Sequence, residues 1–265
     1  MLEEIKQAIQ YPLRKLGYEI RKLSKPPISS LVPINVFPLA VVDLMQRKEE
    51  NRDSQEDFFF VQIGAHDGLH FDPIRPFIKK RHWKGILVEP QPAIYQRLKA
   101  NYREEPQLSF ENAAISSHDG EAILYVFKKT AALPDHVTML ASFDKGALVH
   151  NGHHYQGEIE ELKVPTLTLT TLLAKHRVTK IDLLQIDTEG FDFEIIKMLE
   201  NCAIKPELIH FESAFMNQHK THECGELLHR LGYRALTIGI DTIAYRQTDE
   251  GNFDFVEVLA NKGYG

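Results

Sequence analysis

The chain has 265 residues, of which 43% are hydrophobic and 26% are charged, and its formal net charge is −6. This length is enough to bury one large core, so a small scaffold held together by disulfides is excluded. The acidic balance gives no reason to expect a nucleic-acid partner, which usually requires a basic surface.

The cysteines and the apolar runs bear on the compartment. The two cysteines, Cys202 and Cys224, show neither metal-ligand spacing nor a disulfide framework, so a reducing compartment is expected. The first residues lack a cationic start followed by an apolar core, and the longest apolar run is too short for a transmembrane segment. A cytoplasmic location is therefore expected.

The N-terminal part differs from the rest of the chain. Apolar residues recur at three- and four-residue steps over residues 2–23, which predicts an interrupted amphipathic helix. Its basic residues lie largely off the apolar stripe, so peripheral contact with an anionic membrane or a partner helix is one interpretation. The more ordinary one is packing on its own domain or in a homodimer. A proline-rich connector follows over residues 26–38, so residues 1–50 are expected to be an extension and residues 51–265 the main domain.

From Phe58 onward, short apolar runs alternate with helix-like segments, which predicts an α/β fold with a parallel sheet and helices on both faces. The expected strands are Phe58–Ile63, Gly85–Glu89, Leu108–Ile115, Ile181–Asp187 and Leu208–Glu212. The expected helices are Ala93–Tyr102, Phe191–Asn201 and His222–Leu231, with Gly232 as the cap of the last. Two further runs, Tyr233–Ile238 and Thr242–Arg246, are joined by so short a turn that they must pair antiparallel.

This alternation stops between the third and fourth expected strands. Residues 121–127 alternate like an added strand, and residues 128–157 show no clear period. The second segment is interpreted either as a substrate loop or lid, or as an irregular insertion without a role in the site. Its histidines, among them His153 and His154, have no third ligand at metal spacing, so no metal site is expected there.

A glycine-containing turn follows the first strand, in the order Gly64-Ala65-His66-Asp67-Gly68. A parallel strand that ends in such a turn allows a ligand to approach the backbone closely, although purely structural units use similar turns. The spacing is not G-x-G-x-x-G, which disfavours a dinucleotide, and no phosphate-binding G-x-x-x-x-G-K-[ST] loop is present in the sequence.

Carboxylates follow the ends of three expected strands, at the edge where open α/β sheets bind ligands. Glu89 lies where nucleotide-binding domains place a carboxylate on the ribose hydroxyls, or else it only caps the helix that begins near Pro90. Asp187 and Glu189 could hold a substrate hydroxyl, act as a base, grip a ligand's amino group, or bind a divalent cation with Glu212. The structural alternative is that they cap the next helix and complement its dipole.

Five blocks of sequence occur in a characteristic order: VQIGAHDG, GILVEPQP, ENAAISSHDGEA, VPTLTLTTLL and IDLLQIDTEGFDFEIIKML. Over residues 58–246, this pattern resembles the FkbM-type S-adenosylmethionine-dependent methyltransferases. The resemblance implies a Rossmann-like methyltransferase fold, with a seven-stranded sheet whose last strand is antiparallel. It implies methyl transfer to a hydroxyl of a sugar, a glycan or another natural product.

The resemblance also implies roles for individual residues. Asp187 would be the base or orienting group, with Glu189 the second choice and His154 a distant third. A divalent cation is not favoured, and its ligands would be Asp187, Glu189 and Glu212. The cofactor S-adenosylmethionine would contact Gln62, Gly64, Ala65, His66, Asp67, Gly68, Glu89, Pro90, Asn112, Ala113 and Asp187.

Two departures from the family pattern affect the first block: His66 stands where the family usually has Asn, and Gln62 where an acidic residue is frequent. The competing functions are an NAD(P)-dependent oxidoreductase on a similar fold and a non-catalytic adaptor that retains the fold.

Overall fold

The computed structural model describes residues 37–50, 57–128, 133–134, 137, 140–151 and 158–246. The chain divides into two compact units, one made of residues 1–56 with 250–265 and the other of residues 57–249. The described part of the first unit is helix α2, Phe37–Glu50, which begins inside the predicted connector. The amphipathic helix expected in residues 2–23 lies outside the described residues. None of the helices that the structure describes combines the length and the apolar character needed to cross a membrane.

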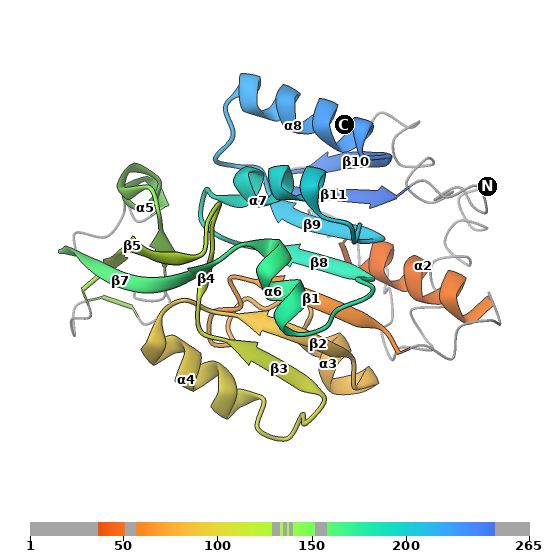
Figure 1. The fold of residues 1–265 in the computed structure, drawn as a ribbon, viewed down its shortest axis with the longest axis horizontal. Helices are drawn as coiled ribbons and strands as arrows, with labels where there is room; N and C mark the ends of the chain where they lie inside the picture. Colours follow the sequence, from red (N-terminus) through yellow and green to blue (C-terminus); the bar gives the residue numbers. More distant parts are fainter. Residues whose placement is uncertain are drawn as a thin grey trace, which may run out of the picture. The chain divides into compact units, whose positions relative to one another are not determined.

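A seven-stranded sheet forms the centre of the second unit (Figure 1), with the strand order β10-β11-β9-β8-β1-β2-β3. The five strands from β9 to β3 pair in parallel, whereas β11 is antiparallel to both of its neighbours. The predicted Rossmann-like methyltransferase sheet with an antiparallel last strand is therefore confirmed. The bounds are Phe59–Ile63 for β1, Lys84–Val88 for β2, Leu108–Glu111 for β3, Leu183–Ile186 for β8, Leu208–Glu212 for β9, Tyr233–Ile238 for β10 and Asp241–Arg246 for β11.

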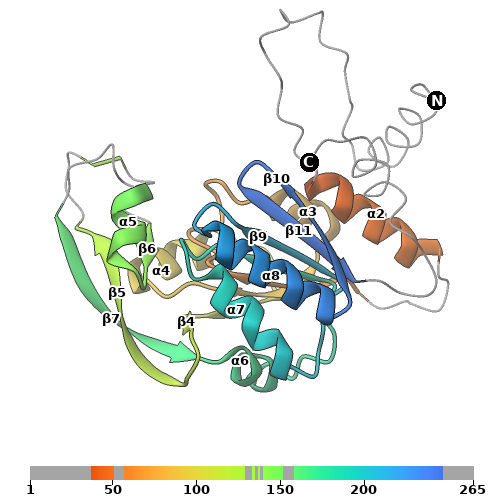
Figure 2. The ribbon, with the colours of Figure 1, turned by 90° about the horizontal axis from the view of Figure 1, so that it is seen from above.

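Helices cover both faces of this sheet (Figure 2). On one face, helices α6, Leu169–Lys175, α7, Asp192–Met198, and α8, Gln218–Arg230, share one apolar cluster with inward-facing strand residues such as Val61 and Ile63. On the other face, Trp83 stacks on Phe58 and on Phe77 of α3, Arg75–Arg81, at ring-centroid distances of 3.9 and 5.2 Å. Because both faces are buried, β1 and β8 are nearly continuous apolar runs, which is why the sequence revealed them.

Two helix boundaries differ from the sequence prediction. Helix α8 begins at Gln218, four residues before the predicted start at His222, because the Asn217 side chain caps it by accepting a hydrogen bond from Lys220 N at 2.9 Å. Helix α7 ends at Met198 and continues as a 3₁₀ turn over Leu199–Asn201. Helix α4, Pro92–Asn101, agrees with its prediction to within one residue at each end.

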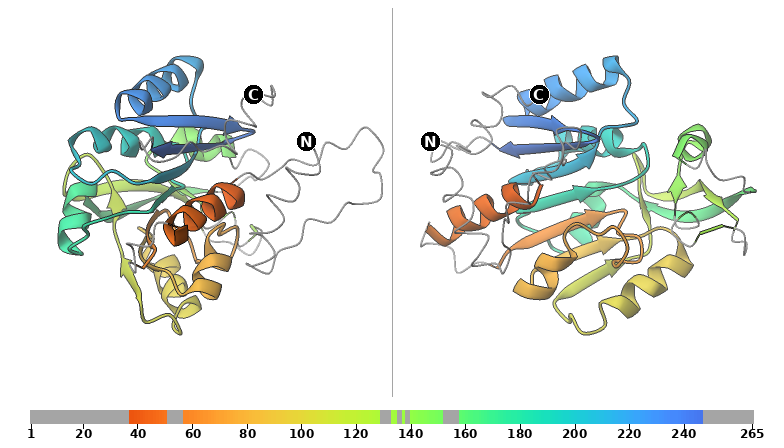
Figure 3. Two further views of the ribbon diagram at one scale, coloured as in Figure 1. Left: turned by 90° about the vertical axis from the view of Figure 1, so that its right-hand side faces the viewer. Right: turned by 180° about the vertical axis from the view of Figure 1, so that it is seen from behind.

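A second, four-stranded sheet lies beside the main one (Figure 3), with the order β4-β7-β5-β6. Its strands are β4, Ala114–Ile115, β5, Gly120–Phe127, β6, Ala141–Ser142, and β7, Ile159–Leu167, and helix α5, Lys145–Asn151, follows β6. The added strand predicted over residues 121–127 is confirmed as β5. The prediction of one strand over Leu108–Ile115 was wrong, because the chain leaves the main sheet after Glu111 and pairs with β7 from Ala114.

Candidate active site

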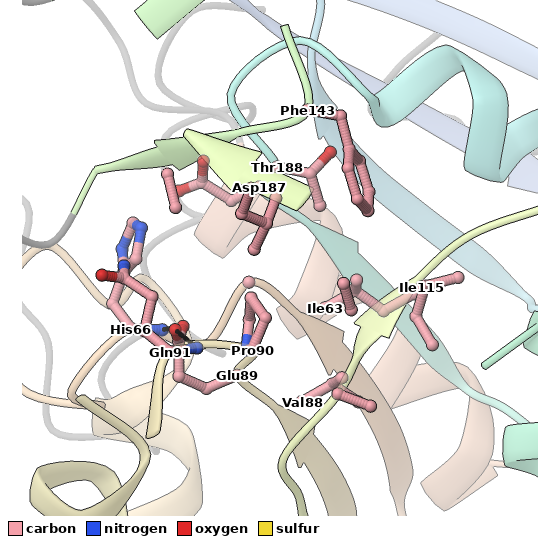
Figure 4. Close-up of a pocket in the computed structure, with 15 residues that line it drawn as sticks. Ile63, His66, Val88, Glu89, Pro90, Gln91, Ile115, Phe143, Asp187 and Thr188 are labelled. Atoms are coloured by element: carbon pink, nitrogen blue, oxygen red, sulfur yellow. Dashed lines mark hydrogen bonds between the residues drawn. The ribbon is translucent and has the colours of Figure 1, made fainter. Parts of the chain in front are cut away.

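A cavity lies at the carboxyl ends of β1, β2 and β8, and the second sheet closes its far side (Figure 4). Its walls are mostly apolar, and they include Val88, Ile115 and Leu124. The cavity is small, at about 40 Å³. Of the residues that the sequence assigned to the cofactor, six line this cavity: Gly64, His66, Glu89, Pro90, Ala113 and Asp187.

Glu89 is held in one orientation although it follows the end of its strand. Its carboxylate oxygens accept hydrogen bonds from the backbone N–H groups of His66, at 3.0 Å, and Gln91, at 2.9 Å. The side chain is only 1% exposed, and this burial raises the pKa of Glu89 to about 7 despite the two donors. A ligand that brings further hydrogen-bond donors to Glu89 would favour its ionised form.

The glycine turn is held mainly by contacts within the protein. The N–H groups of Gly64 and Ala65 both donate to the carbonyl of Val88, at 3.0 and 2.9 Å, so they are already used. Gly64 has a φ of 79°, and a Cβ there would lie 1.7 Å from the carbonyl oxygen of Asp187. A Cβ on Gly68 would lie 2.4 Å from the Tyr102 ring. These glycines therefore allow the β1 loop to pack against its neighbours, a reason that differs from the ligand approach inferred from the sequence.

The Asp67 side chain stabilises this loop through hydrogen bonds. Its carboxylate accepts hydrogen bonds from the N–H groups of Leu69 and His70 and from the guanidinium of Arg97, at 3.0, 3.0 and 3.1 Å. The side chain is completely buried. The residue is not among those that line the cavity, so its geometry suits a supporting role.

Four other residues with a predicted cofactor role also do not line the cavity. They are Gln62, Ala65, Gly68 and Asn112. Asn112 donates to the carbonyls of Glu89 and Pro90, at 2.8 and 3.1 Å, and so holds the β2 loop in place. Gln62 donates to Asp72 at 3.2 Å, and its buried Oε1 has no hydrogen-bond partner among the described residues.

His66 occupies a backbone conformation that explains its substitution for the usual Asn. Its φ is 47°, in the left-handed region where Asn, Asp and His are all enriched over other residues with a side chain. Its N–H holds Glu89, and the residue itself lines the cavity. His66 therefore retains the turn that an Asn would form.

The turn after β8 brings one of its two carboxylates to the cavity. Asp187 N donates to the Ile63 carbonyl at 2.9 Å, which ties this turn to β1. The half-buried Asp187 side chain lines the cavity, and it makes no hydrogen bond or ion pair with any described residue. Glu189, at a φ of 52°, does not line the cavity, and its carbonyl accepts a hydrogen bond from the Ser142 hydroxyl at 2.7 Å. The third predicted catalytic residue, His154, lies outside the described residues.

Sequence reasoning missed the wall that the second sheet contributes. Leu124, Ala141 and Phe143 line the cavity together with Glu89 and Asp187. Ala141 belongs to a two-residue strand in the segment without periodicity, so no local pattern could have placed it. Thr188 was also missed; its hydroxyl donates to Asp192 at 2.8 Å, inside a block that was interpreted only through its acidic residues.

A second cavity, of about 310 Å³, adjoins this region, and Phe143 lines both cavities. Burial and the nearby Asp187 raise the pKa of Asp192 to about 6. The pKa of Glu212 is raised to about 8, mainly by burial and then by neighbouring carboxylates. Within the described part of the chain, no three His, Cys, Asp or Glu side chains are grouped so that they could hold a metal ion.

Solved methyltransferase structures resemble the chain in fold. The methyltransferase domain of METTL16 shares 12% identity at a TM-score of 0.45, covering 93% of this chain and 81% of its own. The human METTL16 N-terminal domain in complex with SAH shares 11% at a TM-score of 0.41, covering 93% and 83%. Precorrin-6y C5,15-methyltransferase from Geobacter metallireducens GS-15 shares 13% identity at a TM-score of 0.38, and the match covers 82% of this chain and 93% of its own. No curated protein matches the chain.

A family model shows the relationship directly. The model of the methyltransferase FkbM domain matches residues 62–235, from the end of β1 into β10. The match includes the glycine turn, Glu89, Asn112 and Asp187, and it spans more than half of the 265 residues. The chain therefore belongs to the FkbM methyltransferase family.

Proposed function

We propose that the protein transfers the methyl group of S-adenosylmethionine to a hydroxyl of a sugar, a glycan or another natural product. The observation that carries this proposal is the pair of carboxylates on one cavity. Glu89 is fixed by two backbone donors, whereas the Asp187 side chain makes no hydrogen bond or ion pair with any described residue. The fixed Glu89 suits a contact with the cofactor, which is the same in every turnover. The unbonded Asp187 suits a group that gains and loses a proton during the reaction.

The cavity residues have the chemistry that this cofactor requires. Glu89 can accept hydrogen bonds from the two ribose hydroxyls, and Val88, Ala113 and Ile115 offer apolar surface to the adenine ring. The cavity of about 40 Å³ is smaller than a typical ligand pocket, so we expect the Phe143 wall to shift outward when the cofactor enters. Phe143 belongs to the loop after β6, outside the main sheet. The main sheet can therefore keep its conformation when Phe143 moves.

Asp187 has the position of a group that accepts or orients a proton. When bound, S-adenosylmethionine supplies an electrophilic methyl group on a sulfonium. The acceptor oxygen would take this methyl group as S-adenosylhomocysteine leaves, and Asp187 would accept or orient the hydroxyl proton. Most of the acceleration is expected from alignment of the two reactants in a site that excludes water.

Ligand-dependent thermal melting tests the cofactor. S-adenosylhomocysteine at about 100 times its Kd should stabilise the protein by about 2.7 kcal/mol, whereas NADH should leave the melting temperature unchanged. Stabilisation by NADH alone would favour the oxidoreductase. Failure of both ligands to bind the folded protein would favour the non-catalytic adaptor.

The acceptor is identified by transfer itself. The folded protein is incubated with S-adenosylmethionine and a panel of hydroxylated acceptors, and products are followed by the mass gain of one methyl group. Methylation at nitrogen or carbon, located by fragmentation, would contradict the hydroxyl assignment while leaving the cofactor assignment intact.

A further inference from the structure

The cavity of about 310 Å³ lies between the start of α7, the end of β9 and the loop that precedes α5. We propose that this cavity binds the methyl acceptor, and that the acceptor is a compact ring that carries a protonated amine beside its hydroxyls, as an amino sugar does. The inference rests on the proposed methyl transfer and narrows its substrate class.

The position of the cavity connects it to the reacting centre. Phe143 lines both cavities, and its ring contacts that of Phe191 edge-on at a centroid distance of 4.8 Å. Thr188 lines the first cavity and donates to Asp192, which lines the second. The two cavities therefore share Phe143 as a wall, and a ring in the second cavity would lie next to the cavity that Asp187 lines.

The walls of this cavity suit the faces of a small ring. Phe143, Phe191, Phe193, Phe215 and Met216 supply apolar and mostly aromatic surface. Aromatic faces attract both the C–H edges of a saturated ring and a nearby cation, because the ring quadrupole is negative on its face. The volume is at the lower end of the range for ligand pockets, which limits the bound part to a compact group.

The charge in the cavity selects among such rings. The half-buried Glu212 carboxyl lines the cavity and makes no hydrogen bond or ion pair with the described residues. The charges that act on it are those of Asp187, Asp192 and Asp241, all of the same sign. Lys220 also lines the cavity, at an exposed position, but it is not among the groups that influence Glu212. An ammonium group would give this carboxyl a partner and offset the repulsion, whereas a phosphate would increase it.

Matched sugars test the proposal on the full chain saturated with S-adenosylhomocysteine. Glucosamine and galactosamine are compared with glucose and galactose by calorimetric titration, and glucose 6-phosphate is the anionic arm. We expect each amino sugar to bind about tenfold more tightly than its neutral counterpart, the size of one charge-assisted hydrogen bond. Equal affinities, a preference for the phosphate, or no binding of any amino sugar would overturn the proposal.

Two variants assign the preference to Glu212. Glu212→Gln keeps the shape of the side chain and should reduce the ratio between amino and neutral sugars to about one. Glu226→Gln removes the same charge from an exposed position on α8 and should leave the ratio unchanged. If Glu212→Gln still prefers amino sugars, the proposal is overturned. It is also overturned if this variant loses affinity for S-adenosylmethionine but not for S-adenosylhomocysteine, because Glu212 would then contact the sulfonium.

The two proposals can fail separately. If the wild-type protein does not bind S-adenosylhomocysteine, the proposed methyl transfer is wrong. If it binds S-adenosylhomocysteine and shows no preference for amines, only the acceptor class is wrong. Melting curves of both variants establish that they are folded before their affinities are compared.

Discussion

The site has two parts: the proposed cofactor side, with Asp67, Glu89 and Asn112, and the proposed acceptor side, with Asp187 and Glu212. Their polar side chains differ in their hydrogen bonds. On the cofactor side, Asp67, Glu89 and Asn112 are each committed to hydrogen bonds with the protein's own backbone. On the acceptor side, the carboxyls of Asp187 and Glu212 have no such partners among the described residues. The proposed cofactor side is thus held by the protein's own hydrogen bonds, whereas the carboxyls on the proposed acceptor side can accept hydrogen bonds from a ligand.

The same contrast appears in the electrostatics. Burial raises the pKa of Glu89, and the nearby Asp187 adds to this increase, whereas the His66 side chain and the backbone N–H groups of His66 and Gln91 lower it. Glu212 is affected by burial and by three carboxylates, all of which raise its pKa. A cationic ligand is therefore worth more on the acceptor side, because protein groups there leave the negative potential uncompensated.

The largest expected effect comes from the unpartnered carboxylate. Asp187→Asn keeps the shape of the side chain and removes its ability to take a proton, so kcat should fall by about 10² to 10⁴. The Kd for S-adenosylhomocysteine should change by less than about threefold, because we assign the ribose contacts to Glu89. Single-turnover methyl transfer and calorimetric titration measure the two quantities.

Glu189 provides the comparison for this variant. Glu189→Gln should lower kcat far less, because the residue does not line the cavity. Full activity in Asp187→Asn, or a larger loss in Glu189→Gln, would reverse the roles that the geometry supports.

Gly64 lies in the loop after β1 and packs against the backbone of Asp187 in the turn after β8. A Cβ on Gly64 should therefore disturb both segments. Gly64→Ala places that atom 1.7 Å from the Asp187 carbonyl at a φ of 79°, and we expect a loss of about 3 kcal/mol in the free energy of unfolding. Urea unfolding measures this loss as a lower midpoint with an unchanged slope.

Gly225 is the matched control, because it lies within α8 and a Cβ there would meet no atom within 4 Å. Gly225→Ala should stabilise the protein by about 0.5 to 1 kcal/mol through helix propensity. A Gly64→Ala protein as stable as the wild type would show that the loop can move away from Asp187.

The sequence places the residues at the ends of the parallel strands more readily than the residues of the other cavity walls, for a physical reason. The glycine turn and Glu89 each follow directly from a buried parallel strand, so local pattern and position at the sheet edge were enough. Phe143 follows a strand of only two residues, and Glu212 lies close to Asp192 only through the pairing of β8 with β9. Such contacts depend on tertiary packing, which periodicity does not record.

A smaller effect than those at Asp187 and Gly64 is expected from the pH dependence that Glu89 gives to ligand binding. The pKa of Glu89 is raised from 4.5 to about 7, so its contribution to the stability of the free protein is present below about pH 4.5 and is lost as the pH rises through 7. Ribose hydroxyls favour the ionised carboxylate, so the affinity for S-adenosylhomocysteine should instead rise about tenfold between pH 6 and pH 8. Glu89→Gln should bind more weakly and show no such rise. Because Asp192 and Glu212 also titrate near this range, the ratio of wild-type to variant affinity at each pH isolates Glu89. A ratio that stays constant from pH 6 to 8 would mean that the ribose does not contact Glu89. The hydrogen bonds that fix Glu89 would then have no bearing on cofactor binding, and the proposed contrast between the two sides would lose its main support.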